Sequence, residues 1–264
     1  MELEPLLLVE DLAVEIGGRP ILENINLEIK PGEVHVLFGP NGSGKSSLLG
    51  TIMGFPRYRV VRGKIYFRGE DITGLPVEER AARGIGLAFQ RPPALRGVLL
   101  GQLLERFKGD GEKARLGARE LNLEDFLDRE VNIGFSGGET KRSEILQLWV
   151  QDPQLALLDE PESGVDVENL ALIGRAINYL LERESPPWEG KPLRELRRTR
   201  SKGGLIITHT GHILNYVDAD VGHVLFQGSI RCSGNPRELF SFIQKVGYSE
   251  CIRCVNSREV GENG

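Results

Sequence analysis

Length, composition and charge limit the classes of protein to which this chain can belong. Its 264 residues and 29.3 kDa correspond to one large domain or to one domain with an inserted lobe. Hydrophobic residues make up 40% and charged residues 27%, an ordinary globular composition that excludes wholesale disorder. Lys and Arg number 33 against 38 Asp and Glu, a net charge of −5, which is the wrong sign for nucleic-acid binding through bulk positive charge. We expect no nucleic-acid partner.

The sequence carries no signal for insertion into a membrane or for passage across one. No apolar run approaches the roughly 18 to 20 residues that span a bilayer. The start, MELEPLLLVEDL, lacks the basic residues that open a secretion signal. The cysteines, Cys232, Cys251 and Cys254, lie far from most of the chain and cannot form a disulfide framework for it. These features predict a cytoplasmic location with no direct membrane insertion.

The first 90 residues predict strands with one phosphate-loop connection. Short β-prone runs separated by Gly17 and Gly18 predict an antiparallel edge, and a hairpin is expected at GKIYFRGEDI. A continuous apolar run, Val34 to Phe38, predicts a strand buried on both faces that leads through a glycine-rich loop into a helix. The edge runs are 6–9, 14–16 and 25–29, the helix is 47–53, and a further strand is 85–90.

The rest of the chain alternates helices and strands. Helical spacing of apolar residues from 97 to 130 predicts a small helical lobe. Beyond it, strand and helix patterns alternate, which predicts a mainly parallel sheet of the α/β class. The alternating elements are helices at 139–151 and 167–184 and strands at 155–158 and 205–207. Between the last helix and strand, residues 185–204 are rich in proline, glycine and basic residues, which predicts a mobile surface loop.

One glycine-rich segment matches a phosphate-binding loop in full. The residues GPNGSGKS fit the pattern G-x-x-x-x-G-K-[ST] and lie between a buried strand and a helix, where the mechanism requires them. Backbone N–H groups would surround the phosphates, Lys45 would reach the β- and γ-phosphates, and Ser46 would ligate Mg²⁺. The predicted nucleotide-binding residues are Gly39, Pro40, Asn41, Gly42, Ser43, Gly44, Lys45, Ser46 and Ser47.

Two adjacent carboxylates follow the strand at 155–158. Ligands bind at the carboxyl ends of strands in open α/β sheets, so Asp159 and Glu160 lie where a nucleotide would be processed. Asp159 is expected to hold Mg²⁺, and Glu160 to polarise the attacking water as the catalytic base. Alone, such a pair more often just faces solvent, but the phosphate loop strengthens the functional interpretation.

The segment FSGGE, Phe135 to Glu139, lies upstream of LALLDEP, and together with the phosphate loop it resembles the ATP-binding cassette (ABC) ATPases. In that family two copies dimerise head to tail, and the signature serine and glycines of one copy complete the nucleotide site of the other. The resemblance assigns this role to Ser136, Gly137 and Gly138. Taken alone, SGGE would be interpreted as a helix N-cap.

Three further positions match the family residue by residue. Gln90 corresponds to the glutamine that senses Mg²⁺ and the γ-phosphate and joins the core to the helical lobe. His209 corresponds to the switch histidine, a catalytic residue that contacts the γ-phosphate, and Asp166 to the loop that lies across the dimer interface. The alternatives are an exposed glutamine, a structural histidine and an N-cap aspartate. The family's aromatic adenine contact is missing, and Ile16 is the candidate replacement.

Longer stretches resemble one branch of the family, the SufC ATPases of the SUF iron-sulfur cluster assembly machinery. They are FSGGETKRSEILQ, ITHTGHILNYVDADVGHVLFQGSI and PGEVHVLFGPNGSGKSSL. The resemblance implies an ATPase that uses ATP and Mg²⁺, forms an ATP-dependent homodimer and drives a SufB/SufD-like scaffold protein. The segment 90–98 is the expected coupling surface, and Lys141 is expected to pair with Glu160 in the free subunit. The alternative is the nucleotide-binding subunit of a membrane transporter.

The expected organisation is a single ABC ATPase domain over residues 1–264. Its catalytic core comprises 1–90 and 136–248, with a helical subdomain at 91–135, the mobile basic loop at 185–204 and a C-terminal tail at 249–264. In the tail, Cys251 and Cys254 are either exposed thiols or two ligands of a metal site completed by other residues. ABC ATPases that manage DNA are excluded, since their long coiled coil is absent from this sequence.

Overall fold

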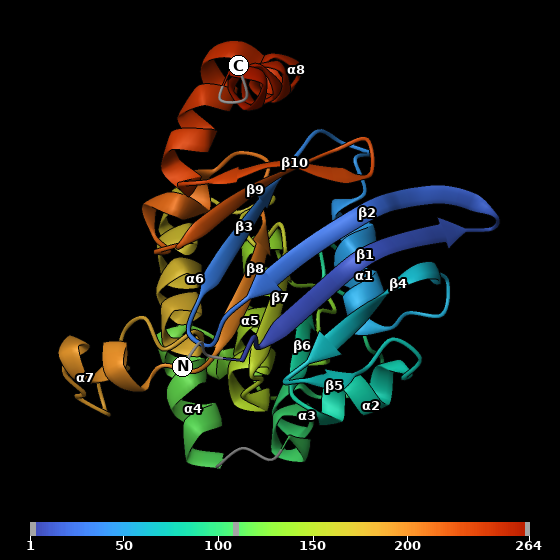
Figure 1. Cartoon of the computed structure of the whole chain (residues 1–264). Coiled ribbons are helices and arrows are strands. Elements are labelled where there is room, and N and C mark those ends of the chain that lie inside the picture. Colours follow the sequence, from blue (N-terminus) through green and yellow to red (C-terminus); the bar gives the residue numbers. More distant parts are fainter. Residues whose placement is uncertain (1–3, 108–110, 262–264) are drawn as a thin grey trace.

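The computed structural model describes residues 4–107 and 111–261, with side chains through residue 249, and two sheets organise it (Figure 1). The first is an antiparallel sheet with strand order β2-β1-β4-β5, and the second has the order β10-β9-β3-β8-β7-β6. The first sheet comprises β1 (Leu7–Ile16), β2 (Arg19–Ile29), β4 (Arg59–Phe67) and β5 (Glu70–Asp71). The second comprises β3 (Val34–Phe38), β6 (Ile85–Ala88), β7 (Leu155–Asp159), β8 (Gly203–Ile207), β9 (Val221–Phe226) and β10 (Ser229–Gly234).

The antiparallel edge predicted from the sequence is confirmed, but two of its predicted short strands are one. β1 runs through both apolar segments because a bulge absorbs the polar residues between them, where the register shifts after Val9 and Asp11 has φ of 44°. Gly63 of β4 lies opposite this bulge, and a Cβ there would meet the carbonyl oxygen of Glu10 at 2.3 Å. Only glycine permits this close approach.

The mainly parallel sheet confirms the predicted α/β fold class. Each neighbouring pair from β9 to β6 is parallel, and β10 adds an antiparallel edge. All five residues of β3, β7 and β8 are buried, as a sheet covered on both faces requires. The carboxyl ends of β3, β6, β7 and β8 therefore lie at one edge, where the loops that follow them gather.

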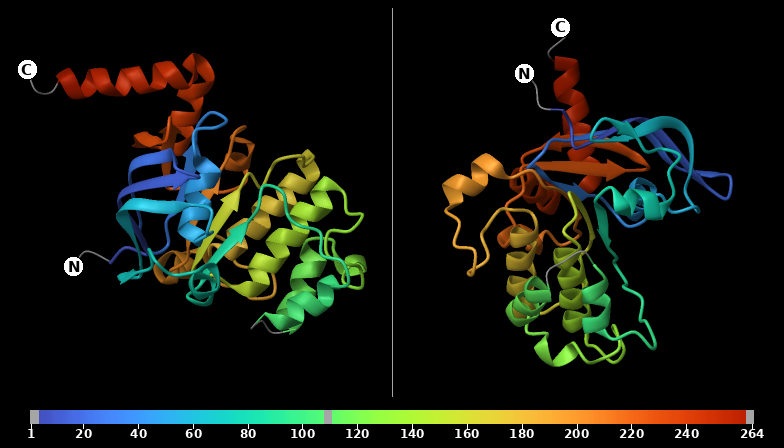
Figure 2. Two further views of the ribbon diagram at one scale, coloured as in Figure 1. Left: turned by 90° about the vertical axis from the view of Figure 1, so that its right-hand side faces the viewer. Right: turned by 90° about the horizontal axis from the view of Figure 1, so that it is seen from below.

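Helices cover both faces of this sheet (Figure 2). On one face α1 (Lys45–Met53) packs between the two sheets, and its Leu48, Leu49 and Ile52 share a core with residues of β1, β3 and β7. On the other face α5 and α6 join a second core with the helical lobe. α2 (Val77–Ala82) packs against the first core. The helices of the second core are α3 (Leu100–Arg106), α4 (Gly111–Glu120), η1 (Glu124–Phe126), α5 (Gly137–Gln151) and α6 (Val167–Leu180).

The basic segment 185–204 contains regular structure where a loop was predicted. Residues Leu193–Thr199 form α7, in which Leu196 is buried, and residues 203 and 204 already belong to β8. Trp188 stacks on Trp149 of α5 with ring centroids 5.6 Å apart. Stacking and burial hold the segment to the body, which its proline and charge content did not indicate. Its mobility stays a prediction.

A short 3₁₀ helix, η2 (His212–Asn215), precedes β9. The last element is α8 (Pro236–Gly261), and its outer half projects from the body (Figure 2). Gly247 has non-helical dihedral angles, φ 78° and ψ 169°, so α8 is two helical segments meeting at a kink. The predicted tail at 249–264 is therefore helical as far as Gly261. None of the helices that the structure describes has the length and apolar character needed to cross a membrane.

Two buried histidines lie between β3 and β9. Nδ1 of His35 lies 2.9 Å from Nε2 of His223, and Nδ1 of His223 lies 2.7 Å from the hydroxyl of Ser233. Burial lowers the pKa of His223 to about 3, with repulsion from His35 acting in the same direction. Because the unfolded chain binds a proton at this residue below pH 6.5 and the folded chain does not, acid weakens folding.

We therefore predict that the wild type loses about 2 kcal/mol more unfolding free energy between pH 7 and pH 5 than the variant His223→Gln. Urea unfolding at the two pH values measures this difference. The variant His212→Gln alters an exposed histidine and should keep the wild-type pH dependence. Equal pH dependence in all three proteins would contradict the burial argument.

Candidate nucleotide-binding and hydrolysis site

The phosphate loop connects β3 to α1, where its sequence places it (Figure 1). Gly39 lies so close to β9 that a Cβ would meet the carbonyl oxygen of Leu225 at 2.2 Å, and Gly44 has φ of 106° at the N-cap of α1. Both positions require glycine. The backbone thus turns sharply into a helix N-terminus, where N–H groups and the helix dipole favour a phosphate. Ser47 lies in the first turn of α1.

Lys45 is held under the loop that it follows. Its ammonium donates to the carbonyl oxygens of Gly39 at 2.9 Å and Pro40 at 3.1 Å, and only 5% of the residue is exposed. Burial lowers the pKa of Lys45, while the charges of Glu160 and Asp159 oppose this shift. The geometry fits a cation placed for the phosphates of a nucleotide, because the charge is desolvated and faces two carboxylates across the site.

Ser46 and Asp159 fit a magnesium site. Asp159, at the end of β7, is 8% exposed, and a hydrogen bond from the Ser46 hydroxyl joins it to the start of α1. Burial raises the pKa of Asp159, and the Ser46 hydrogen bond opposes this. Within the described residues its buried Oδ1 has no hydrogen-bond partner. A hydroxyl and a carboxylate with an unused oxygen are ligands that Mg²⁺ takes in nucleotide sites.

Glu160 is the meeting point of the site. Its Oε2 accepts a hydrogen bond from Nε2 of Gln90 at 2.7 Å, and its Oε1 lies 2.8 Å from Nε2 of His209. The side chains come from the ends of β7, β6 and β8, which are neighbours in the sheet. The sequence motifs indicate all three residues but no contact among them. Glu160 also has φ of 51°, a left-handed conformation that is uncommon outside glycine.

The surroundings of His209 favour its neutral form. Burial lowers the pKa of His209, the charge of Lys45 acts in the same direction, and the carboxylates Glu160 and Asp159 oppose it. A neutral imidazole with its proton on Nε2 donates a hydrogen bond to Glu160. His209 can therefore hold this carboxylate in place without a buried positive charge of its own.

The predicted pairing of Lys141 with Glu160 is wrong. Lys141, on α5, donates instead to the carbonyl oxygen of Phe89 at 2.6 Å and lies 3.7 Å from Glu144. The Phe89 N–H in turn donates to Glu144, so the backbone N–H and C=O of Phe89 are both held by two buried side chains one helical turn apart. Lys141 and Glu144 are three residues apart, so the helix places both side chains on one face. Only the tertiary fold brings Phe89 to that face.

We predict that Lys141→Met lowers the free energy of unfolding by about 3 kcal/mol, because it leaves Glu144 buried without its cation. Burial already raises the pKa of Glu144 to about 7, with the charge of Lys141 opposing that shift. Urea unfolding at pH 8 measures the effect. Lys191→Met, which breaks an exposed pair with Glu189, is the control and should change little. Similar unfolding midpoints for the two variants would show that the buried pair is not stabilising.

The signature residues lie at the start of α5. Ser136 is the N-cap of α5 and forms a capping box with Glu139, so the N-cap interpretation is confirmed. Gly137 approaches the loop before α6, where a Cβ would meet the carbonyl oxygen of Gly164 at 2.9 Å. Asp166 caps α6 by accepting from Asn169 N at 2.9 Å. The part that Ser136, Gly137, Gly138 and Asp166 play at a second nucleotide site stays a prediction.

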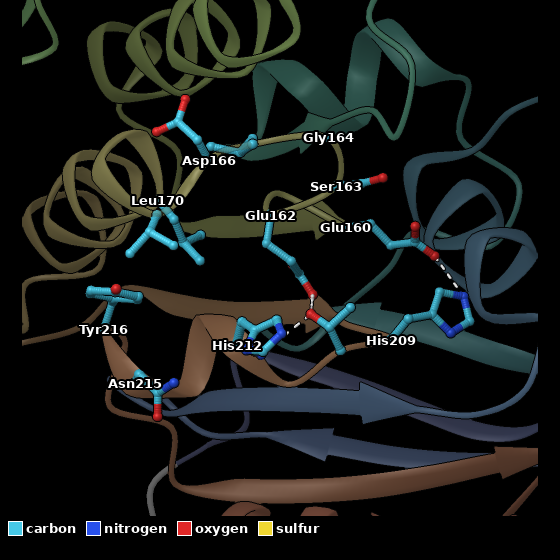
Figure 3. Close-up of a pocket in the computed structure, with 13 residues that line it drawn as sticks. Glu160, Glu162, Ser163, Gly164, Asp166, Leu170, His209, His212, Asn215 and Tyr216 are labelled. Carbon is cyan, nitrogen blue, oxygen red and sulfur yellow. Dashed lines mark hydrogen bonds and ion pairs between the residues drawn. The ribbon is translucent and has the colours of Figure 1, made fainter.

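A cleft of about 600 Å³ opens between these loops (Figure 3). Glu160, Glu162 and His209 lie along it, and Asp166 and Tyr216 bound the far side. The cleft thus joins Glu160 to the loop 163–166 that follows it.

Two expectations stay untested. Ile16 ends β1 half-buried, and its contact with adenine stays a prediction. The side chains of Cys251 and Cys254 lie outside the described residues. In the part of the chain that the structure does describe, no three His, Cys, Asp or Glu side chains are grouped as metal ligands.

The fold and the site define a P-loop ATPase of the cassette type, and comparisons with known proteins agree. The family model described as "ABC transporter" matches residues 22–163. Vegetative protein 296 of Bacillus subtilis is 39% identical over 256 residues, covering 92% of this chain and 91% of its own. The probable ATP-dependent transporter SufC of Escherichia coli is 37% identical over 259 residues, covering 92% and 97%. A solved nucleotide-free cassette from an ABC transporter superposes with a TM-score of 0.71 at 26% identity, covering 92% and 96%.

The chain belongs to the ABC ATPase family, and within that family it is a SufC-like ATPase. It accordingly binds and hydrolyses ATP.

Proposed function

We propose that this chain is the ATP-hydrolysing subunit of a cytoplasmic iron-sulfur cluster assembly machine. It dimerises head to tail on ATP and drives a conformational change in a SufB/SufD-like scaffold protein. The similarity to SufC and the stretches that resemble the SufC branch support this assignment. The single observation that carries it in the structure is the contact of Gln90 with Glu160, since Gln90 directly follows a surface suited to a partner.

That surface is an apolar groove beside Gln90. Phe89 and Leu95 are 38% and 37% exposed and line the same groove, so their apolar surface is open to a partner. The groove is lined by Leu87, Phe89, Pro92, Pro93, Leu95, Phe107, Val131, Asn132, Glu144, Gln147, Leu148 and Gln151. A scaffold that packs here would press on the residue next to Gln90. Its binding would therefore reach Glu160 through one hydrogen bond.

The segment 90–98 is tethered well enough to transmit such a movement. The Leu95 N–H donates to Val131 O at 3.0 Å, and the Asn132 amide donates to Pro93 O at 2.8 Å. These bonds tie the segment to the end of the helical lobe. A partner that moves the lobe would consequently move the segment that carries Gln90.

In the proposed reaction each residue has a separate task. Lys45 and the loop N–H groups bind the β- and γ-phosphates, and Glu160 orients and deprotonates the attacking water. His209 holds Glu160 and faces the γ-phosphate. Bound Mg²⁺, held by Ser46, Asp159 and Gln90, would neutralise charge on the phosphate oxygens. Ser136, Gly137, Gly138 and Asp166 of a second copy would close the site.

One alternative is favoured by a specific finding. The matching family model is described as an ABC transporter, and so is the solved structure named above. Under this alternative the same apolar groove would bind a membrane-embedded subunit, and the chemistry at Glu160 would be unchanged.

Affinity purification distinguishes the two functions. Glu160→Gln protein, incubated with ATP and Mg²⁺ in its native cell extract, should hold the closed dimer on its partner, and mass spectrometry identifies what is recovered. Lys45→Ala protein is the matched control, since it should not close. Recovery of a β-helical scaffold, or of cluster absorption in the complex, supports the assembly function. Recovery of a polytopic membrane protein only with detergent would establish the transporter alternative instead.

A further inference from the structure

Two threonines flank His209, and both of their hydroxyl groups reach the same carboxylate. Oγ1 of Thr208 donates to Oε1 of Glu162, and Oγ1 of Thr210 lies 3.4 Å from that same oxygen. We propose that Glu162 is a positioning residue for ATP hydrolysis, because its carboxylate holds the segment 208–210 and so places His209 against Glu160. Neither the sequence motifs nor the reaction described above assigns Glu162 a role.

The sheet explains why these groups meet. β7 and β8 are parallel neighbours, with Asp159 paired with Ile207, and the Glu160 N–H donates to Ile207 O at 3.1 Å. The two loops therefore leave the sheet side by side. Glu162 lies in the first loop, two residues after Glu160. There it contacts Thr208 and Thr210 of the second loop, the residues directly before and after His209.

The threonine hydroxyls also organise the next turn. Thr208 Oγ1 accepts from the Gly211 N–H at 2.9 Å, and Thr210 Oγ1 accepts from the His212 N–H at 3.4 Å. Each hydroxyl thus donates to Glu162 and accepts from the backbone that follows. The Glu162 carboxylate orients both hydroxyls, and through them it sets the path of the chain on both sides of His209.

The anchor is buried while the group it positions is not. Glu162 is 7% exposed and Thr208 is fully buried, whereas the His209 side chain keeps 28% of its surface exposed. The Glu162 backbone is itself fixed, since its carbonyl oxygen accepts from the Val165 N–H at 3.3 Å. A buried anchor beneath a partly exposed side chain is the arrangement that precise placement needs.

Stability alone does not account for Glu162. Within the described residues its buried Oε2 has no hydrogen-bond partner, and burial without a partner costs free energy. Figure 3 shows Glu162, Glu160 and His209 along one cleft, with Glu162 directed toward the turn at His212. What the side chain provides is an acceptor oxygen at the base of the His209 segment.

The test separates the acceptor from the charge. Glu162→Ala removes the acceptor, Glu162→Gln keeps an oxygen in its place, and Thr208→Val removes one donor with little change of shape. We expect kcat to fall at least tenfold in Glu162→Ala, to stay within about twofold of wild type in Glu162→Gln, and to fall several-fold in Thr208→Val. The dissociation constant for ATP should stay within about threefold in all three, because Lys45 and the phosphate loop are untouched.

A spectroscopic readout reports on His209 itself. The chain has four histidines, so isotope-labelled imidazole signals can be resolved and that of His209 assigned with His209→Asn. In Glu162→Ala the His209 signal should move as the ring loses its place beside Glu160. Glu162→Gln should leave the signal unchanged. Glu238→Ala, at an exposed position on α8, is the control for loss of a carboxylate.

The double variant Glu162→Ala with Thr208→Val should be no slower than Glu162→Ala alone, since both changes remove one interaction. Unchanged kcat and an unmoved His209 signal in Glu162→Ala would overturn the proposal. Equal loss of kcat in the alanine and glutamine variants would overturn it too, because the acceptor oxygen would then not matter. Should the alanine variant fail to fold, Thr208→Val and Glu162→Gln still decide the outcome.

Discussion

Replacing Glu160 with glutamine is expected to lower kcat for ATP hydrolysis by about 10²- to 10⁴-fold while ATP binding is kept. The amide retains the size of the side chain and one acceptor oxygen, but it cannot take a proton from water. Because Lys45 and the phosphate loop lie on other elements, the affinity for ATP should change little. Phosphate release measures kcat, and calorimetry with a non-hydrolysable analogue measures binding.

The surroundings of Glu160 explain why no neighbour can replace it. Gln90 donates to one oxygen of the carboxylate, and His209 contacts the other. Gln90 is an amide, and the pKa of His209 is lowered, mainly by burial, so it is a weak base. Glu168→Gln, at an exposed position in the first turn of α6, controls for the loss of a charge nearby. A Glu160→Gln protein that hydrolyses ATP within about threefold of the wild-type rate would exclude Glu160 as the base.

Replacing Lys45 with alanine is expected to weaken ATP binding by about 100-fold and to abolish hydrolysis at ordinary ATP concentrations. A hydrogen bond to a charged group contributes about 1.5 to 3 kcal/mol, and Lys45 is a desolvated cation that faces the phosphates. Its loss also removes a positive charge that interacts with Glu160 and Asp159, so the site repels an anion more strongly. Isothermal calorimetry measures the dissociation constant.

Two comparisons make the Lys45 result specific. Lys30→Ala removes a cation that is half exposed in a surface pair, and it should bind ATP as the wild type does. The midpoint of thermal unfolding of Lys45→Ala should be compared as well, because its ammonium bridges the carbonyl oxygens of Gly39 and Pro40. A folded Lys45→Ala protein with wild-type affinity for ATP would show that the phosphate loop does not bind the nucleotide.

Local patterns in the sequence predicted the elements that hold the site. The run Val34 to Phe38 is β3 residue for residue, because five consecutive apolar side chains suit a strand covered on both faces. The glycines of the phosphate loop were predictive because positive φ and close backbone approach are open only to glycine. Such signals lie within a few residues of each other and need no knowledge of distant segments.

Prediction was weaker where an element depends on a contact far along the chain. Proline and basic residues made 185–204 look like a loop, but α7 forms there, with Leu196 buried and Trp188 stacked on Trp149. Residues 6–16 looked like two strands, since the bulge at Asp11 needs Gly63 of a neighbouring strand. In each case the partner lies tens of residues away, so no local pattern contains it.

The site divides in the same way. From the sequence alone come the α/β class, the phosphate loop, the paired carboxylates and the positions of Gln90 and His209. Only the tertiary structure decided that Gln90 and His209 both contact Glu160, that Lys141 binds Phe89 instead, and that Glu162 lies beneath the histidine. Residue type and spacing specify what a side chain can do, whereas strand order specifies which side chains meet, and that order follows from the packing of the whole chain.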